Sequence, residues 1–310
     1  MSASDETLFD NNTWAGAQPR LSVLIPFKGD DPVDLLLALD REAADVEIVL
    51  LDDGSQDEGL AQRVTQTVAA ARTPARFVRL AANIGRAKGR NRLASHARGE
   101  ALLFLDSDMA PDDPHFLGRW RSLVDDENPP IAFGGFSLKQ APLRRETALH
   151  RRMAANSDCL GCDARRLAPE KTLFTSNLLI RRDVFDAEAF DEGFSGWGWE
   201  DVEWAMRAVR RWPILHIDNT ATHLGLDSAA TLAAKYEQSA ANFARVAERH
   251  PQIVADYPSY RVARALKHVP LPTVWRPALK AFALADAAPL GAREFAMRLY
   301  RAALYAETIR

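Results

Sequence analysis

Apolar runs and amphipathic helical segments alternate along the first third of the chain. The run LSVLIPF, from Leu21 to Phe27, predicts a strand that is buried on both faces of a parallel sheet. Leu35, Leu36 and Leu39 follow at helical spacing, and VEIVLLDDGS then predicts a second buried strand that ends in two carboxylates and a glycine turn. These three segments form a βαβ unit.

The unit repeats further along the chain. A helix is predicted over about residues 57–72, a strand over RFVRL, a helix over about 87–97 and another strand over ALLFLDSD. Such alternation favours an α/β fold with a doubly wound, mostly parallel, Rossmann-like sheet, whose ligands bind beyond the carboxyl ends of its strands. Asp52, Asp53, Asp106 and Asp108 all fall at such ends.

The remaining segments give weaker patterns. Residues 1–20 lack an apolar period and are expected to be a tail, while residues 138–167 contain six arginines and are expected to be a flexible loop with a helix. Strand signals return in TLFTSNLLIRRDVF and PILHI, with an amphipathic stretch over 202–209 between them. From about Ser228 the chain is predicted to be helical. Its apolar faces are formed by Leu232, Tyr236, Phe243 and Val246, and by Phe295, Leu299 and Ala303.

Composition excludes several classes of protein. With 47% hydrophobic residues among 310, the chain can bury a large core, and a net charge of -3 gives no basic field for nucleic acid. No apolar run approaches the roughly 18 residues of a membrane span, and the first residues are too polar for a signal peptide, so a soluble, cytoplasmic protein is expected. Cys159 and Cys162 have CxxC spacing, but one pair cannot complete a zinc site, so plain thiols are favoured.

The last fifty residues carry a local excess of positive charge. Residues 261–310 hold nine Lys or Arg and three Asp or Glu. We favour a solvated helical subdomain packed on the sheet. The alternative is peripheral association with anionic lipid at the inner face of the cell membrane.

Three polar segments carry candidate chemistry. Asp106 and Asp108 flank one serine directly after a strand, a spacing that lets both carboxylates reach one Mg²⁺ or Mn²⁺ together with substrate phosphates. The segment NIGRAKGRN offers glycines for close backbone approach and guanidinium groups for phosphate. The segment GFSGWGWEDVE offers tryptophan faces for a sugar ring and two carboxylates, although its tryptophans could also be core residues and its acids could simply favour a helix N-terminus.

Taken in order, these segments resemble the inverting glycosyltransferases of the GT-A fold, family two. The resemblance runs from about Leu21 to His223 and rests on five ordered parts: LSVLIPFKGD, DDGS, NIGRAKGRN, the DxD motif and a late Glu-Asp pair. It implies a GT-A catalytic domain over 21–227, to which the sequence pattern adds a tail over 1–20 and a C-terminal helical region over 228–310. The turn GFSGWGWED resembles the galactosyltransferase-like and chondroitin-synthase-like branches.

The resemblance also implies a role for each site residue. Asp201 is the expected general base, and Glu200 is expected to bind hydroxyls of donor or acceptor. His223 is expected to complete the metal site, with His216 as a rival. Pro26, Phe27 and Asp53 are implied to hold the uracil and ribose of the donor. The other expected donor contacts are Asn83, Arg86, Arg90, Asp106 and Trp199, and the metal ligands are Asp106, Asp108 and His223.

The implied reaction moves one sugar from a nucleotide diphosphate, expected to be a UDP-sugar, to a glycan or lipid-linked acceptor hydroxyl with inversion. A sugar-phosphate nucleotidyltransferase would need a glycine-rich basic loop after the first strand, where this chain has PFKGDDPVD. A non-catalytic glycan- or lipid-binding module would predict loss of the acidic residues, which are intact. Processive synthases usually carry a Gln-x-x-Arg-Trp motif, and neither Arg-Trp pair here has the glutamine.

Overall fold

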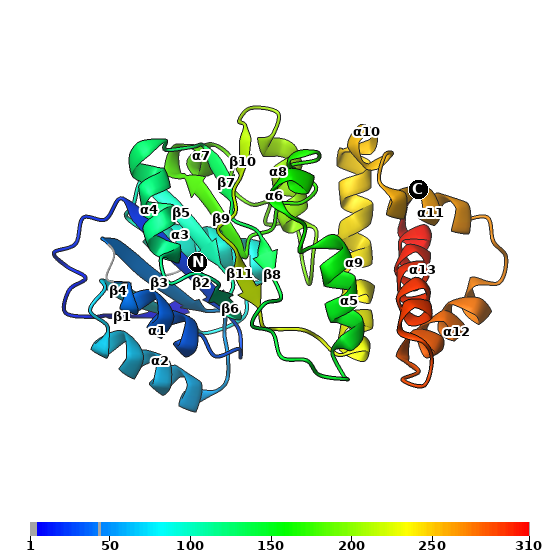
Figure 1. Cartoon of the computed structure of the whole chain (residues 1–310), viewed down its shortest axis with the longest axis horizontal. Coiled ribbons are helices and arrows are strands. Elements are labelled where there is room, and N and C mark those ends of the chain that lie inside the picture. The colour runs from blue at the N-terminus through cyan, green and yellow to red at the C-terminus, as the bar shows by residue number, and fades with distance from the viewer. Residues whose placement is uncertain (1–4, 43–44, 310) are drawn as a thin grey trace.

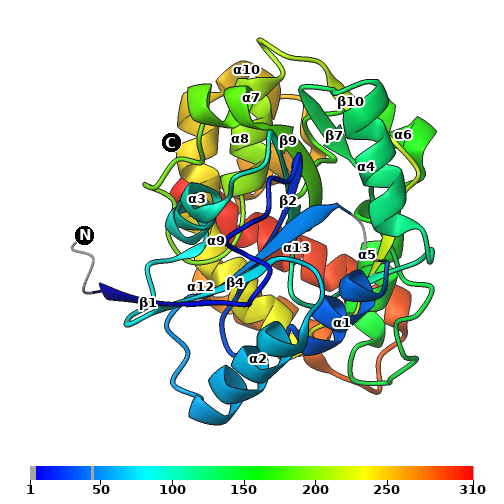
Figure 2. The ribbon, with the colours of Figure 1, turned by 90° about the vertical axis from the view of Figure 1, so that its left-hand side faces the viewer.

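The computed structural model describes residues 5–42 and 45–309, and a mixed eight-stranded sheet organises them (Figure 1, Figure 2). The strand order is β1-β4-β3-β2-β5-β9-β7-β10, with β4, β3, β2 and β5 parallel and with β1 and β9 antiparallel to their neighbours. The predicted α/β, mostly parallel GT-A fold is therefore confirmed. The strands are β1 (Glu6–Asp10), β2 (Leu21–Phe27), β3 (Val46–Asp52), β4 (Ala75–Leu80), β5 (Ala101–Leu105), β7 (Ile131–Phe133), β9 (Asn177–Arg181) and β10 (Ile214–His216).

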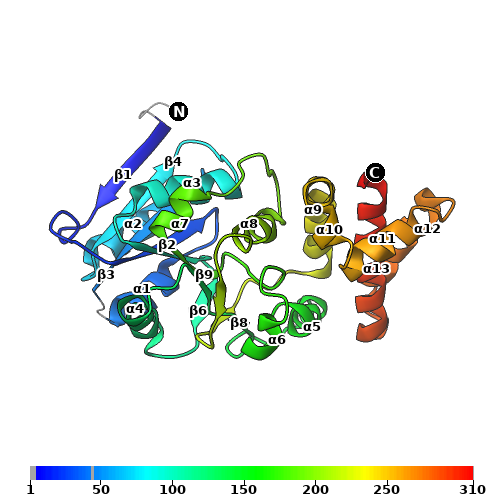
Figure 3. The same ribbon diagram turned by 90° about the horizontal axis from the view of Figure 1, so that it is seen from above.

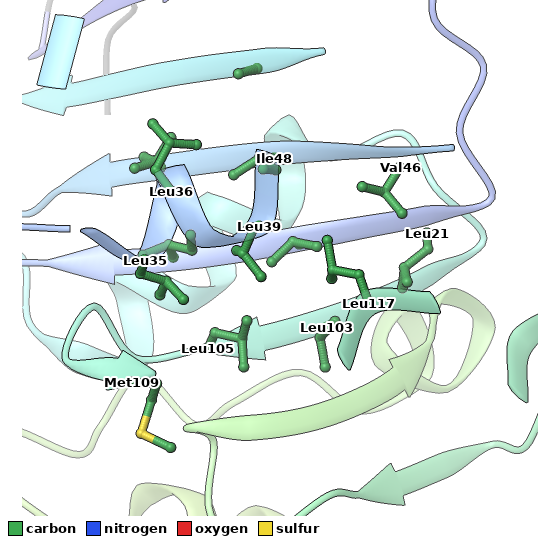
Figure 4. Packing of buried hydrophobic residues seen from close by; sticks show 14 of the residues in the cluster. Leu21, Leu35, Leu36, Leu39, Val46, Ile48, Leu103, Leu105, Met109 and Leu117 are labelled. Atoms are coloured by element: carbon green, nitrogen blue, oxygen red, sulfur yellow. The ribbon is translucent and has the colours of Figure 1, made fainter. Parts of the chain in front are cut away.

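Helices cover both faces of this sheet because its central strands carry apolar side chains on both sides. In β2, Val23 and Ile25 face one cluster while Leu24 faces the other. Helices α1 (Val33–Arg41), α2 (Glu58–Ala70) and α4 (Phe116–Asp126) pack on the first face, part of which Figure 4 shows. Helices α3 (Arg86–His96), α7 (Arg182–Ala187) and α8 (Glu200–Ala208) pack on the second.

A small second sheet forms where the chain leaves β5. It consists of β6 (Met109–Pro111), β11 (Ala221–His223) and β8 (Phe136–Ser137), in the order β6-β11-β8. His223 pairs in register with Met109, the residue after Asp108. This pairing brings the DxD motif and His223 together although they are far apart in the sequence.

The remaining helices form a third apolar cluster at one end of the molecule, opposite β1 (Figure 1, Figure 3). Helix α8 joins this cluster to the sheet, because Trp204 packs toward the sheet while Val202 and Met206 pack toward the helices. The helices of this cluster are α5 (Ala148–Ser157), α9 (Ala229–Arg249), α10 (Pro251–Val254), α11 (Pro258–Leu266), α12 (Pro272–Leu284) and α13 (Leu290–Thr308). The short helix α6 (Cys162–Arg166) lies outside it.

Three details correct the sequence analysis. The tail predicted over residues 1–20 is wrong from residue 6 onward, since β1 pairs with β4 and the buried Trp14 packs against the guanidinium groups of Arg76 and Arg98. Residues 138–167 contain two helices, α5 and α6, where one was expected. On α13, Phe295 is 64% exposed and does not belong to the buried face.

The division of the chain at residue 227 stays a prediction. The expected helical character from Ser228 is confirmed, since α9 to α13 follow this residue. The Ser228 hydroxyl accepts a hydrogen bond from the backbone N–H of Thr231 and so caps α9. Helix α5, which lies within the expected catalytic domain, nevertheless packs with this region, and Arg152 of α5 pairs with Glu294 of α13 at 2.6 Å. The helices and the sheet are thus interlocked.

Asn11 fixes the N-terminal segment and provides a test of its structural role. Its buried amide donates to the carbonyls of Ala71 and Thr73 and accepts from the backbone N–H of Ala75. We predict that Asn11→Ala lowers the free energy of unfolding by about 2 kcal/mol or more, because buried backbone groups lose their partners. Urea denaturation measures the change. The exposed neighbour Asn12 is the control: if Asn12→Ala costs as much, Asn11 has no special role.

Candidate active site

A cavity of about 820 Å³ lies beyond the carboxyl ends of β2, β3 and β5. Its walls come from the sheet on one side and from α5, α8, α9 and α13 on the other. The sequence-predicted residues that line it are Pro26, Phe27, Asp53, Arg86, Arg90, Asp106, Asp108, Trp199, Glu200, Asp201 and His223. Asn83 is not among its lining residues.

The end of the cavity at β2 and β3 is shaped by Asp53. Its carboxylate accepts hydrogen bonds from the Asn83 side chain (2.7 Å) and from the backbone N–H groups of Ile84 (2.7 Å) and Gly85 (3.1 Å). Gly54 has a positive φ of 75°, and a Cβ there would lie 2.4 Å from the backbone nitrogen of Asn83. The DDGS turn and the NIG segment are therefore held against each other, and Asn83 acts through Asp53.

A buried charge cluster occupies the centre of the site. Glu200, only 3% exposed, accepts from the guanidinium groups of Arg86 (2.7 Å) and Arg90 (3.3 Å). Arg90 also donates to Asp106 at 2.9 Å. Arg86 and Arg90, which were expected to contact donor, thus bind carboxylates of this chain and link α3, α8 and the end of β5.

Asp201 follows Glu200 at the start of α8 and has an unusual ionisation. Burial raises the pKa of Asp201 to about 7, and the negative charge of Glu200 adds to this effect. The two arginines hold the pKa of Glu200 below its ordinary value, although burial alone would raise it. Adjacent carboxylates with pKa values driven apart are a typical arrangement for acid and base roles.

The turn before α8 is strained and is held by the C-terminal helices. Gly196, Gly198 and Trp199 all have positive φ, which for tryptophan is rare. Asn242 of α9 donates to backbone carbonyls of this turn, including that of Gly198 at 2.9 Å. The Trp199 indole donates to the hydroxyl of Tyr305 on α13 at 3.1 Å. The helices thereby fix the position of Glu200 and Asp201.

Asp108 and His223 form the candidate metal site. His223 Nε2 lies 3.2 Å from one carboxylate oxygen of Asp108, while the other oxygen is buried without a hydrogen-bond partner. Burial would lower the pKa of His223, but the hydrogen bond and charge of Asp108 hold it above its ordinary value. A Cβ at Gly225 would lie 1.9 Å from a carboxylate oxygen of Asp108, so a larger residue there would displace this carboxylate. A carboxylate oxygen without a hydrogen-bond partner, next to an imidazole, is a suitable pair of ligands for a divalent cation.

Other acids make this part of the cavity negative. The pKa of Asp30 is raised by burial and then by the charges of Asp108, Asp106 and Asp227. Among residues 5–42 and 45–309, no three His, Cys, Asp or Glu side chains form a ready-made metal site. An ion held here would therefore need ligands from a substrate, as Mg²⁺ and Mn²⁺ often have.

Sequence reasoning missed the wall formed by the helical region. Lys235 and Tyr236 of α9 and Arg298, Arg301 and Tyr305 of α13 all line the cavity. The available signal was an arginine at position 301 within the apolar stripe of α13, since charged residues on a buried helix face usually have a function. The rival His216 is excluded from the cavity lining and is buried in β10 beside Arg165.

Cys159 and Cys162 are free thiols, as expected. Cys162 donates to the backbone carbonyl of His216, and burial raises the pKa of Cys159 to about 12. Such a thiol is poorly nucleophilic at neutral pH.

Comparison with protein families supports the resemblance seen in the sequence. The family model described as "Glycosyl transferase family 2" matches residues 22–187, more than half of the chain. The chain belongs to this family. The glycosyltransferase is thereby favoured over the nucleotidyltransferase considered from sequence. The match ends before the Trp-rich turn, so the galactosyltransferase-like resemblance of that turn remains a proposal. No curated protein sequence matches the chain significantly.

The fold of this glycosyltransferase is similar to that of a solved mannosyltransferase. The mannosyltransferase PcManGT from Pyrobaculum calidifontis, solved in complex with GDP-Man and Mn²⁺, aligns with a TM-score of 0.59 and 16% identity over 96% of this chain and 89% of its own. S. aureus TarS 1-349 aligns with a TM-score of 0.46 and 15% identity over 91% of this chain and 89% of its own. At 16% identity the likeness to the mannosyltransferase concerns the fold alone.

In the described part of this glycosyltransferase, none of the helices is both long enough and apolar enough to cross a bilayer.

Proposed function

We propose that this glycosyltransferase moves a single sugar from a nucleotide diphosphate donor to an acceptor hydroxyl, with inversion and with the help of a divalent cation. The observation that carries the proposal is Asp201, a carboxylate in the cavity wall with a pKa of about 7. A base with that pKa is half ionised at neutral pH, where proton transfer is most efficient.

The donor is proposed to bind with its base and ribose near Pro26, Phe27 and Asp53, and with its diphosphate near Asp108 and His223. Asp53 supports this end by holding the loop at Asn83 in place. A UDP-sugar is our expected donor from the family resemblance. GDP-Man bound to the structurally similar mannosyltransferase supports the wider class of nucleotide diphosphate sugars.

Mn²⁺ or Mg²⁺ is the proposed cofactor. Asp108 and His223 would hold it, and Asp106 would lie beside it while bound to Arg90. When bound, the cation would neutralise the charge that builds on the departing diphosphate. The Mn²⁺ in the similar mannosyltransferase supports this choice.

The chain's own residues supply the remaining chemistry. Ionised Asp201 accepts the proton of the acceptor hydroxyl while the hydroxyl oxygen forms a bond to the anomeric carbon and the nucleotide diphosphate leaves from the opposite side. A single displacement of this kind inverts the anomeric centre. Glu200, held by Arg86 and Arg90, orients sugar hydroxyls, and Trp199 offers a flat apolar face to the ring.

The first functional prediction concerns the base. Asp201→Asn keeps the size and most of the hydrogen bonding, so donor affinity should change little while the transfer rate falls by about a hundredfold or more. In the parent enzyme the rate should fall about tenfold for each pH unit below 7, because protonated Asp201 cannot accept a proton. Glu200→Gln should reduce both donor binding and rate.

Asp201→Asn should also raise the stability of the fold, so a loss of activity could not be attributed to unfolding. Because burial raises the folded-state pKa of Asp201, its ionisation costs folding free energy as pH rises from about 4 to 7, at about 1.4 kcal/mol for each pKa unit. Asp201→Asn should therefore melt higher than the parent at pH 8 and gain nothing near pH 3. Asp186→Asn, at an exposed position on α7, is the control. An Asp201→Asn rate within about threefold of the parent would show that another group is the base.

The second functional prediction concerns the metal. Asp108→Ala and His223→Ala should each weaken Mn²⁺-dependent binding of nucleotide by roughly tenfold or more, since each removes a proposed ligand. Thermal shift with a panel of nucleotide sugars, with and without Mn²⁺, measures binding and also identifies the donor. His115→Ala, at an exposed site just before α4 that does not line the cavity, should have no effect. Full turnover in excess chelator would contradict the metal requirement.

We also propose that α11 and the turn before α12 bring the enzyme to an anionic membrane that carries a lipid-linked acceptor. Most basic side chains of the C-terminal region are paired internally, including Arg293 with Asp286 and Arg298 with Glu294. Arg264 on α11 is exposed and has no carboxylate partner in the described part of the chain, and two further exposed cations lie beside it: Arg261, which pairs with the exposed Asp256, and Lys267, which follows α11. The following turn exposes the apolar residues Val269 (42%) and Leu271 (67%), and the start of α12 exposes Val274 (66%). Basic and apolar groups on one surface favour binding to anionic lipid.

The start of α11 supports this proposal, because Tyr257, Pro258 and Ser259 line the cavity. A membrane that contacts α11 would hold its lipid near the cavity. We predict that Leu271→Asp with Val274→Asp lowers binding to phosphatidylserine vesicles about tenfold or more, through the cost of charge in the bilayer interface. Sedimentation with vesicles measures it. Leu37→Asp, exposed on α1, is the control. Equal binding by all three proteins, or none by the parent, would refute membrane docking.

A further inference from the structure

An unpaired arginine lies in the helical wall of the cavity. Arg301 of α13 lines the cavity, and its Nε is buried without a hydrogen-bond partner. Within residues 5–42 and 45–309, no carboxylate comes within ion-pair distance of its guanidinium, whose neighbour is Tyr236: the guanidinium carbon lies 5.1 Å from the centroid of that ring, and the Tyr236 side chain also hydrogen-bonds with Arg301. An aromatic face compensates only part of the cost of burying a charge.

Unlike Arg301, the neighbouring arginines each have a carboxylate partner. Arg152 and Arg298 both donate to Glu294, and Arg293 pairs with Asp286. Asp158 is the acid that acts on Arg301 electrostatically, but it lies beyond ion-pair distance and accepts from the Ser157 hydroxyl. Arg301 is half-buried with its Nε enclosed, and a guanidinium that faces a cavity without an anion beside it is suited to an anionic ligand.

The position of Arg301 assigns this ligand to the acceptor. The proposed nucleotide end of the cavity is formed by Pro26 and Phe27 at the sheet, whereas Arg301 lies on α13 beyond the turn that carries the base. Tyr305, one helical turn after Arg301, accepts the hydrogen bond from Trp199 just before Glu200 and Asp201. The wall around Arg301 thus adjoins the turn that carries the base, and it belongs to a helix that does not contribute to the proposed nucleotide end.

We propose that Arg301 binds a phosphate or carboxylate group carried by the acceptor and so selects anionic acceptors. This inference rests on the proposed glycosyl transfer. The planar guanidinium matches two oxygens of either group. The rings of Tyr236 and Tyr305, which also line the cavity, supply apolar surface for the adjoining sugar.

A binding experiment tests the site without catalysis. Inorganic phosphate and acetate are titrated into the full chain by calorimetry, with UDP and Mg²⁺ present to fill the donor end. We expect Arg301→Gln to weaken binding of at least one anion about tenfold or more, the effect of losing charge-assisted hydrogen bonds. Arg276→Gln is the matched control, because Arg276 pairs with Glu307 and does not line the cavity. Equal anion binding by the parent and Arg301→Gln, or none by the parent, overturns the proposal.

Stability provides a second readout. Because Arg301 has no anionic partner, Arg301→Gln should melt at the same temperature as the parent or higher, whereas loss of a structural arginine lowers it. Arg301→Lys keeps the charge without the planar fork and should retain part of the anion affinity. A large drop in melting temperature for both variants would make Arg301 a structural residue and overturn the proposal.

A transfer experiment links the site to specificity. The donor found by thermal shift is offered with an octyl glycoside, the same glycoside carrying a sugar phosphate, and the corresponding uronoside. We expect the parent to prefer one anionic acceptor by about tenfold or more in kcat/KM, and Arg301→Gln to lose that preference while keeping its rate on the neutral glycoside. The preferred anion identifies phosphate or carboxylate as the ligand.

The outcomes distinguish failure of the acceptor site from failure of the proposed glycosyl transfer. If Arg301 controls anion binding but no acceptor receives sugar, the anion site stands and the proposed transfer fails. If transfer occurs and Arg301→Gln slows all three acceptors equally or raises the donor KM, the transfer stands and the acceptor site fails.

Discussion

A carboxylate buried as deeply as Glu200 stays ionised only beside cations, and Arg86 and Arg90 of α3 supply them. Removing the arginines would leave the charge of Glu200 in a place that water cannot reach. The cluster therefore constrains three elements at once, because α3, α8 and the end of β5 must meet in one arrangement for every charge to be compensated. The catalytic end of the sheet depends on that constraint.

The same cluster explains how two adjacent acids differ. Glu200 contacts the arginines, which lower its pKa and hold it as a carboxylate. Asp201 lies farther from them, and both burial and the charge of Glu200 raise its pKa. One acid is then suited to binding and the other to proton transfer. The strained turn at Trp199 keeps this asymmetry in place, with its backbone held by Asn242 and its indole held by Tyr305.

Much of the fold could be predicted because the central strands of a parallel sheet are continuous apolar runs. The sequence positions of Asp53, Asp106 and Asp108 followed from the ends of those strands, and the structure brings them to one cavity. The partners of Arg86 and Arg90 could not be predicted, since Glu200 lies more than a hundred residues away and phosphate was an equally good partner. The β1 strand was missed because TLFD is too short to show a period. Arg301 was missed because tertiary packing, which no local pattern records, decides that α13 faces the cavity.

Strand β1 has a consequence for the behaviour of the protein in concentrated solution. Its five residues run antiparallel to β4 and form the outer edge strand of the large sheet. An uncovered edge presents unpaired N–H and C=O groups that readily accept a strand from another molecule. Strand β1 pairs with the backbone groups that β4 would otherwise present, and the edge that remains is a single short strand, which limits self-association. A cleavage or fusion that displaced β1 would exchange an intramolecular strand pair for an intermolecular one, and aggregation would appear before any loss of the catalytic geometry at the opposite end of the strands.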